Sequence, residues 1–146
     1  MLRRWKRMKE EDGQGIVEFA IAIPLVLFVL LGILEFGWLL NAKITLTSAA
    51  REGARAAVVS TVKHRERAYI ASTEAVAGVS GITIPDDEEH FKYSTSDVII
   101  NNSNNVILEI KGLVDPLVGL FFNDPIEIDA KAVMRIEWGG IEDAAE

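Results

Sequence analysis

Apolar residues dominate one long stretch near the start of the chain, residues 16–40, and no charged side chain lies between Phe19 and Leu34. About 20 apolar residues in a helix are enough to cross the hydrocarbon core of a bilayer. A chain of 146 residues has too small a core to enclose a helix that is apolar on every side. We therefore predict a transmembrane helix over residues 14–40, with Trp38 near the headgroup level.

The residues that follow, 41–78, contain no proline and are rich in alanine, which predicts that the helix continues beyond the membrane. Ala49, Gly53 and Ala57 recur every four residues, so they share one face of this helical extension. Small residues on one face allow a second helix to approach closely. The pattern therefore predicts a helix-packing surface.

Two arginines in the same extension, Arg51 and Arg55, are also four residues apart. They either contact lipid headgroups or acidic partners, or they form an ordinary solvated face. We assign them no catalytic role. A polar run over residues 63–67 predicts either an exposed part of the helix or a join between two helices.

The rest of the chain, residues 79–146, has the pattern of a small antiparallel sheet. Residues 97–100 and 106–111 flank an asparagine-rich turn, which predicts a hairpin. Apolar and charged residues alternate over 126–138, which predicts a closing strand with Val133 as the exception. We expect the helix that ends near Gly78 to cover the apolar face of this sheet. The predicted fold class is α+β, with a long N-terminal helix, transmembrane in its first half, packed on the sheet.

An apolar link, residues 113–122, does not fit the strand pattern. It is either part of the core, a loop that docks on a partner, or a loop at the membrane surface. We favour the core.

Charge divides the chain into a head, a stem and a body. Residues 1–13 carry five Lys and Arg against three Asp and Glu, whereas residues 41–146 carry ten against seventeen. Positive charge before the stem predicts a cytoplasmic N-terminus and a body on the other side of the membrane. The acidic balance argues against nucleic acid as a partner. The absence of cysteine excludes disulfides and thiolate metal sites.

Glu18 lies just inside the apolar stretch, where an ionised carboxylate is costly unless it is paired or reaches water at the interface. The segment Gly13-Gln-Gly-Ile-Val-Glu-Phe19, followed by a long apolar run, resembles the N-terminus of type IV pilin-like proteins, and most closely the TadE-like pseudopilins of the tight-adherence (Flp-type) pilus system. The resemblance implies cleavage by a prepilin peptidase after Gly13, so that Gln14 becomes the first residue and Glu18 the fifth. Phe19 matches the aromatic residue of this subset. Cleavage after Gly15 would make Glu18 the third residue and would not fit the family register.

The resemblance extends beyond the membrane. Residues 48–57 are similar to the small-residue segment of the family, and residues 130–137 more weakly to its closing strand. Cleavage would leave a positive α-amino group on Gln14, which could pair with Glu18 in the same or a neighbouring subunit. Residues 1–13 are then a cytoplasmic leader, and the overall fold is expected to be pilin-like.

Candidate chemistry elsewhere is sparse. His64 and His90 lack the spacing of a zinc site, and residues 86–89 lack the ligand pattern of a calcium loop. The acidic run is better explained as a solvated loop. We predict no metal, no cofactor, no small-molecule substrate and no enzymatic activity.

The resemblance implies a minor pilin-like (pseudopilin) subunit required for biogenesis of a tight-adherence pilus or a related secretion machine. Its implied partners are membrane lipid, a prepilin peptidase, other pilin-like subunits and inner-membrane pilus assembly proteins. Its implied location is the bacterial inner membrane, as a single-pass protein with an extracytoplasmic C-terminal domain, or a surface pilus. The alternative is an uncleaved, single-pass anchor that carries a binding or sensory module.

Overall fold

The computed structural model describes residues 2–60, 63–96, 105–119 and 121–136, and side chains from residue 13 onward except those of residues 95 and 96. Two helices, α1 (Leu2–Val59) and α2 (His64–Val76), are followed by four strands. The strands are β1 (Ile82–Thr83), β2 (Phe91–Ser96), β3 (Asn105–Val114) and β4 (Ile126–Arg135). The fold is α+β, as predicted.

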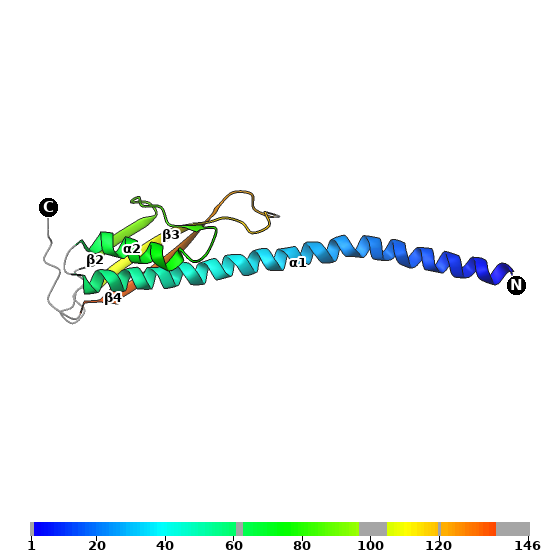
Figure 1. Ribbon diagram of the computed structural model, residues 1–146, viewed down its shortest axis with the longest axis horizontal. Coiled ribbons are helices and arrows are strands. Elements are labelled where there is room, and N and C mark those ends of the chain that lie inside the picture. Colours follow the sequence, from blue (N-terminus) through cyan, green and yellow to red (C-terminus); the bar gives the residue numbers. More distant parts are fainter. Residues whose placement is uncertain (1, 61–62, 97–104, 120, 137–146) are drawn as a thin grey trace.

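Helix α1 is a single element of 58 residues, and it continues through Pro24. At 1.5 Å per residue it is about 87 Å long. Figure 1 shows that its N-terminal half extends away from the rest of the molecule, whereas its C-terminal half lies against α2 and the sheet. The molecule is therefore a long stem with a folded body at one end.

Strand β3 is the centre of an antiparallel sheet. β4 pairs with it along its whole length, from Asn105 opposite Arg135 to Val114 opposite Ile126. The other edge of β3 is shared, because β2 pairs with residues 105–110 and β1 pairs with residues 113–114. Every pairing is antiparallel, so β2 and β3 form a hairpin, as do β3 and β4.

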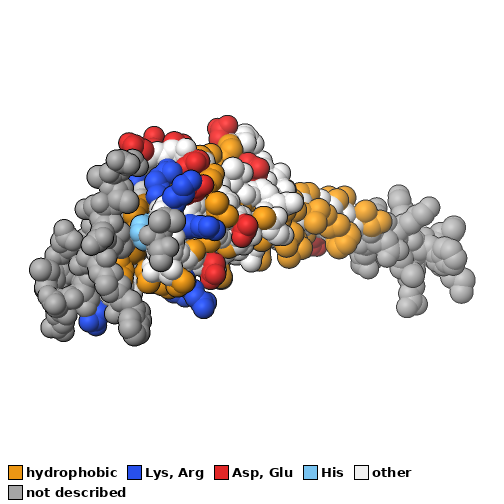
Figure 2. All heavy atoms as spheres, turned by 60° about the vertical axis from the view of Figure 1, so that its left-hand side comes forward, with side chains coloured by type: hydrophobic (Ala, Val, Ile, Leu, Met, Phe, Trp, Pro, Cys, Tyr) orange, Lys and Arg blue, Asp and Glu red, His pale blue; other side chains and the backbone are white. Residues whose placement is uncertain are grey.

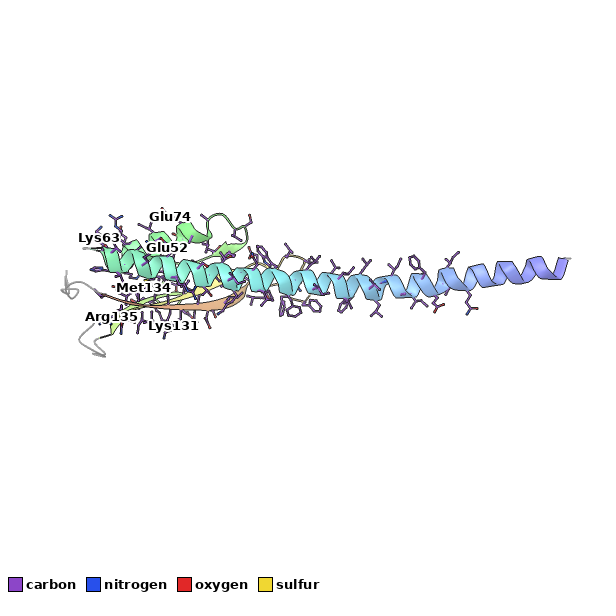
Figure 3. The ribbon with its side chains drawn as sticks, turned by 90° about the horizontal axis from the view of Figure 1, so that it is seen from below. Glu52, Lys63, Glu74, Lys131, Met134 and Arg135 are labelled. Carbon is purple, nitrogen blue, oxygen red and sulfur yellow. The ribbon has the colours of Figure 1, made fainter. Side chains whose placement is uncertain are left out.

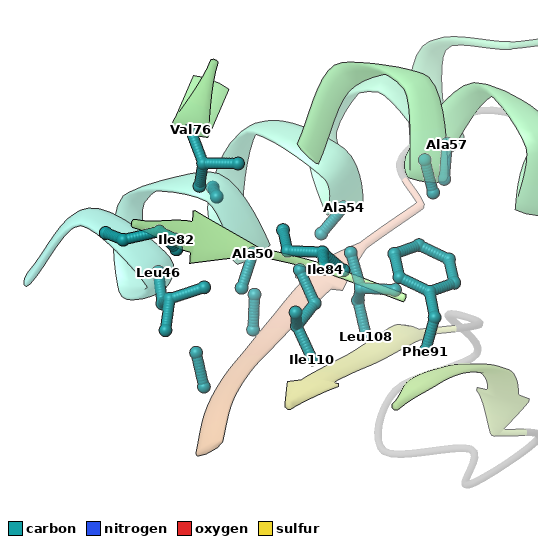
Figure 4. Packing of buried hydrophobic residues seen from close by; sticks show 14 of the residues in the cluster. Leu46, Ala50, Ala54, Ala57, Val76, Ile82, Ile84, Phe91, Leu108 and Ile110 are labelled. Carbon is teal, nitrogen blue, oxygen red and sulfur yellow. The ribbon is translucent and has the colours of Figure 1, made fainter. Parts of the chain in front are cut away.

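The core lies between one face of this sheet and the C-terminal half of α1. Alternate residues of β3 are fully buried, and so is a stripe of small and medium-sized side chains on α1. Phe91 from β2 closes one end of the core beside Tyr69 of α2, with ring centroids 5.1 Å apart. Figure 4 shows this packing. The buried residues on α1 are Ala42, Leu46, Ala49, Ala50, Ala54 and Ala57, and those on β3 are Val106, Leu108, Ile110 and Val114.

Helix α2 packs along the C-terminal part of α1. Lys63 has a left-handed backbone conformation with φ of 54°, and it precedes the first residue of α2. His64 Nδ1 lies 3.0 Å from the carbonyl oxygen of Ala57, and this contact connects the first residue of α2 to the end of α1. Figure 3 shows α2 on one side of α1 and β4 on the other. Both possibilities predicted for residues 63–67 hold in part, because Lys63 lies at the join between the helices and residues 64–67 form the largely exposed first turn of α2.

The strand predictions are confirmed in part. In β4 the even-numbered residues face the core and the odd-numbered ones are exposed, including Val133, the predicted exception. The strand expected over residues 97–100 and its turn lie outside the described residues, and β3 pairs instead with β2, which the pattern did not predict. The cover of the sheet is also different, because α1 makes the larger share of it and α2 packs mainly on α1.

Candidate membrane and assembly site

The predicted processing segment lies on the free half of α1. Gly13, Gln14, Glu18 and Phe19 are all exposed, and the backbone is helical from Leu2 through this segment. A side chain added at Gly13 would meet nothing within 4 Å. The candidate cleavage site is thus accessible along the helix, and no described residue of the folded body covers it.

Glu18 lies one helical turn after Gln14, on the same face of α1. Side chains at this spacing have Cβ atoms about 5–6 Å apart. No cation among the described side chains forms an ion pair with Glu18. The carboxylate therefore extends from an apolar helix surface without a partner in the described part of this chain.

The exposed surface of the stem is apolar nearly throughout. Large aliphatic and aromatic residues from Ile16 to Leu40 are half-exposed or more at most positions. The segment from Gly13 to Val59 is long and apolar enough to cross a membrane, and only 6% of its most apolar stretch is buried in the protein. Figure 2 shows the hydrophobic side chains gathered along the described part of the stem. The helix is suited to a single membrane crossing rather than to a protein core.

The three small residues of the predicted packing surface, Ala49, Gly53 and Ala57, are buried between α1 and α2. A Cβ atom at Gly53 would lie 2.8 Å from the carbonyl oxygen of Ala68 in α2 and would also overlap the Ser72 hydroxyl. The two helices can approach this closely only because residue 53 has no side chain.

Arg51 and Arg55 lie on the opposite, exposed side of α1. No hydrogen bond or ion pair joins either guanidinium to another described side chain. They are available on the outer surface of the body, away from α2 and the sheet.

A second carboxylate on the stem, Glu35, is fully buried, and the sequence indicated no role for it. The backbone N–H of Val118 donates a hydrogen bond of 2.9 Å to its Oε2 atom. Its Oε1 atom is buried and has no hydrogen-bond partner among the described residues. The segment that covers Glu35 is the link between β3 and β4, residues 115–125, which we call the 115–125 loop.

The preference for a core position of residues 113–122 is wrong for most of that segment. Val114 is fully buried in the sheet, but Leu117, Val118, Phe121 and Phe122 are exposed. The loop extends from the body along α1 because Phe121 packs against Phe28 and Phe36 at centroid distances of 5.4 and 6.0 Å. The charged residue Glu35 and the apolar link can both be recognised in the sequence, but no sequence pattern predicts that they are in contact.

Charged groups elsewhere on the body pair with one another. His90 Nδ1 lies 2.7 Å from Asp87, and this hydrogen bond holds the pKa of the Asp87 carboxyl below its usual value. Lys131 lies 2.6 Å from Glu109 and lowers the pKa of that carboxyl in the same way. Arg65 pairs with Asp86 at 2.8 Å. Two of the four residues in the acidic run 86–89 thus have partners within the protein.

No group of three or more metal-ligating side chains occurs within the described ranges. A polar hollow of about 340 Å³ lies on the sheet and is lined by lysine and acidic side chains, including the paired Lys131 and Glu109.

Comparison with known proteins agrees with the geometry of the stem. Residues 13–55 match the family described as TadE-like protein. The matched segment begins at Gly13, includes Glu18 and ends within the helix-packing surface. The chain has no significant match among curated proteins, and none among solved structures. The family implies a pilin-like protein associated with the tight-adherence pilus. The resemblance seen in the sequence is thus confirmed over this segment, because residues 13–55 match the TadE-like family.

Proposed function

We propose that this chain is a minor pilin-like subunit required for biogenesis of a tight-adherence pilus or a related secretion machine. The observation that carries the proposal is the TadE-like segment over residues 13–55, on a helix whose apolar half is not covered by the body. Exposed apolar surface of this extent requires a nonaqueous environment or other subunits. Lipid supplies that cover in the membrane, and the stems of neighbouring subunits supply it in an assembly.

The proposed topology follows from charge. Five basic residues precede Gly13, so the N-terminus remains in the cytoplasm and the body is extracytoplasmic in the bacterial inner membrane. The partners are then a prepilin peptidase at the cytoplasmic face, other pilin-like subunits beside the stem, and inner-membrane pilus assembly proteins. The role is structural rather than enzymatic.

Cleavage between Gly13 and Gln14 would remove the basic leader. Glycine lowers helix stability by about 1 kcal/mol relative to alanine, and Gly13 and Gly15 flank Gln14. Local unwinding at this point would present the scissile peptide to a membrane peptidase. The two glycines therefore give a physical reason for processing at this position of an otherwise continuous helix.

The new α-amino group on Gln14 is the proposed partner of Glu18. It would lie within one helical turn of the carboxylate in the same subunit, and within about 6 Å in membrane depth of Glu18 in an aligned neighbour. An ion pair is stronger in a low dielectric than in water, and either charge alone is costly there. Pairing between neighbours would favour association of stems in one axial register.

The test is pilus assembly in the native host with variants of the processing segment. We expect Gly13→Ala to block maturation, and Glu18→Ala to reduce incorporation or assembly while the body stays folded. Gly37→Ala, at an exposed glycine of the stem far from the processing segment, is the matched control for the first variant, and Glu52→Ala, at an exposed glutamate on the packed half of α1, is the control for the second. Both controls should assemble normally. Normal maturation and normal assembly of Gly13→Ala would contradict the proposal and favour an uncleaved membrane anchor.

A further inference from the structure

The described residues of the 115–125 loop, which are all but residue 120, form an apolar tip beside the stem. No charged residue lies between Asp115 and Asp124. Leu117 is 56% exposed, Phe121 43% and Phe122 39%. Figure 1 shows the loop extending from the sheet in the direction of the N-terminal half of α1. The tip is therefore an apolar surface outside the folded core.

The depth of this tip follows from its contacts with α1. A helix from Ile16 to Glu35 is roughly 30 Å long, which matches the hydrocarbon thickness of a bilayer. Phe121 covers Gly32, because a Cβ atom there would lie 3.2 Å from the phenylalanine ring. The ring thus lies at the end of the apolar span that is nearer the body, within about one helical turn of its boundary.

Two hydrogen bonds hold the loop at this level. Glu35 Oε2 accepts a bond from the Val118 N–H, and the Trp38 indole N–H donates to the Asp115 carbonyl oxygen at 2.9 Å. The loop therefore does not depend on membrane contact for its position. Its charged ends, Asp115 and Asp124, are exposed, as expected for groups that remain in the headgroup region.

The neighbouring surface of α1 is apolar as well. An open groove of about 540 Å³ runs beside Phe121 and is lined by residues such as Val29, Ile33 and Leu40. Polar lining atoms are few, so the groove suits an acyl chain better than a solvated ligand. The tip and the groove together form one apolar surface that continues the membrane-crossing surface of the stem.

We infer that the 115–125 loop is a second membrane-contacting element, which inserts Leu117, Val118, Phe121 and Phe122 into the boundary of the leaflet nearest the body. The occupant of this surface is lipid, with acyl chains against the loop and the groove of α1. The loop sets the depth at which α1 leaves the membrane and the position of the body above it. The inference requires only that α1 crosses a membrane, so it does not depend on cleavage or on pilus assembly.

The absence of cysteine makes a direct test possible. The full chain carrying Leu117→Cys, labelled with an environment-sensitive fluorophore, is placed in vesicles of phosphatidylethanolamine and phosphatidylglycerol. The matched control is Val133→Cys on β4, because Val133 is also apolar and is 56% exposed, like Leu117. We expect iodide in the aqueous phase to quench the label at residue 117 several-fold less than the label at residue 133.

Equal quenching at the two positions would overturn the inference. Phe122→Cys provides a second position on the tip if the label at residue 117 disturbs folding, which circular dichroism would reveal. The measurement is repeated with enough lipid that most vesicles hold a single chain. Protection that persists identifies lipid as the cover, whereas protection lost on dilution would show that a second copy covers the loop and would also overturn the inference.

Discussion

The outer half of α1, residues 13–40, and its inner half, residues 42–57, belong to one continuous helix but differ in what covers them. The outer half carries large apolar side chains that are exposed on nearly every side. The inner half has alanines, a glycine and one leucine on a single buried face, with charged residues such as Arg51 and Glu52 on the other. An all-round apolar surface indicates a nonaqueous environment, whereas a narrow small-residue face indicates close packing against protein.

The largest difference between the halves is expected for leucine truncation. Leu46 is fully buried, so Leu46→Ala should lower the free energy of unfolding of the body by about 2–5 kcal/mol. Leu40 is 66% exposed, so Leu40→Ala should change it by less than about 0.5 kcal/mol. Hydrogen exchange of the β3 amides, measured on the full chain in detergent micelles, reports this free energy. Equal effects of the two substitutions would contradict the division of α1.

A smaller contrast is expected for glycine substitution. Gly53→Ala introduces a methyl group against α2 and Leu108, which should destabilise the body by about 1–3 kcal/mol. Gly37→Ala meets nothing within 4 Å and improves helix propensity, so it should leave the body unchanged or slightly stabilise the helix. Thermal unfolding of both variants in the same detergent sharpens the comparison. A stable Gly53→Ala variant would show that α1 and α2 are not packed as closely as described.

The smallest effect concerns pH and is confined to the body. The hydrogen bond from His90 lowers the pKa of the Asp87 carboxyl. The ionised Asp87 therefore stabilises the folded body at pH values above the ordinary carboxyl pKa of about 3.9. This stabilisation is lost as the pH falls through the lowered pKa. Asp87→Asn should make the unfolding midpoint less dependent on pH in this acid range. Glu88→Gln, at an exposed neighbouring residue, is the control and should retain the dependence. If both variants showed the same pH dependence, the ionisation of Asp87 would not contribute to the stability of the body.

The features that the sequence could predict are those with a local period. The stem follows from unbroken apolar composition, and β4 follows from its strict alternation of apolar and charged residues. Strand β2 has a weaker signal, since only Phe91 and Tyr93 alternate with polar neighbours over its described side chains. Strand β1 has two residues, which is too few for any period to be recognised.

The burial of Glu35 could not be predicted, because it depends on a contact between residues 83 positions apart. The same holds for Phe121, whose partners on α1 are fixed only when the sheet positions the 115–125 loop beside the stem. Local pattern identified the apolar link as unusual but gave no way to choose between core and surface. The processing segment is a different case, because its interpretation came from resemblance rather than from geometry.

The measurement that tests the proposed function most directly is the intact mass of the full chain after co-expression with a prepilin peptidase. The proposal predicts a mature chain that begins at Gln14 and lacks residues 1–13, with Gly13→Ala retaining them. A wild-type chain that retains residues 1–13 in the presence of an active peptidase would contradict the proposal. The chain would then be an uncleaved membrane anchor with a folded body.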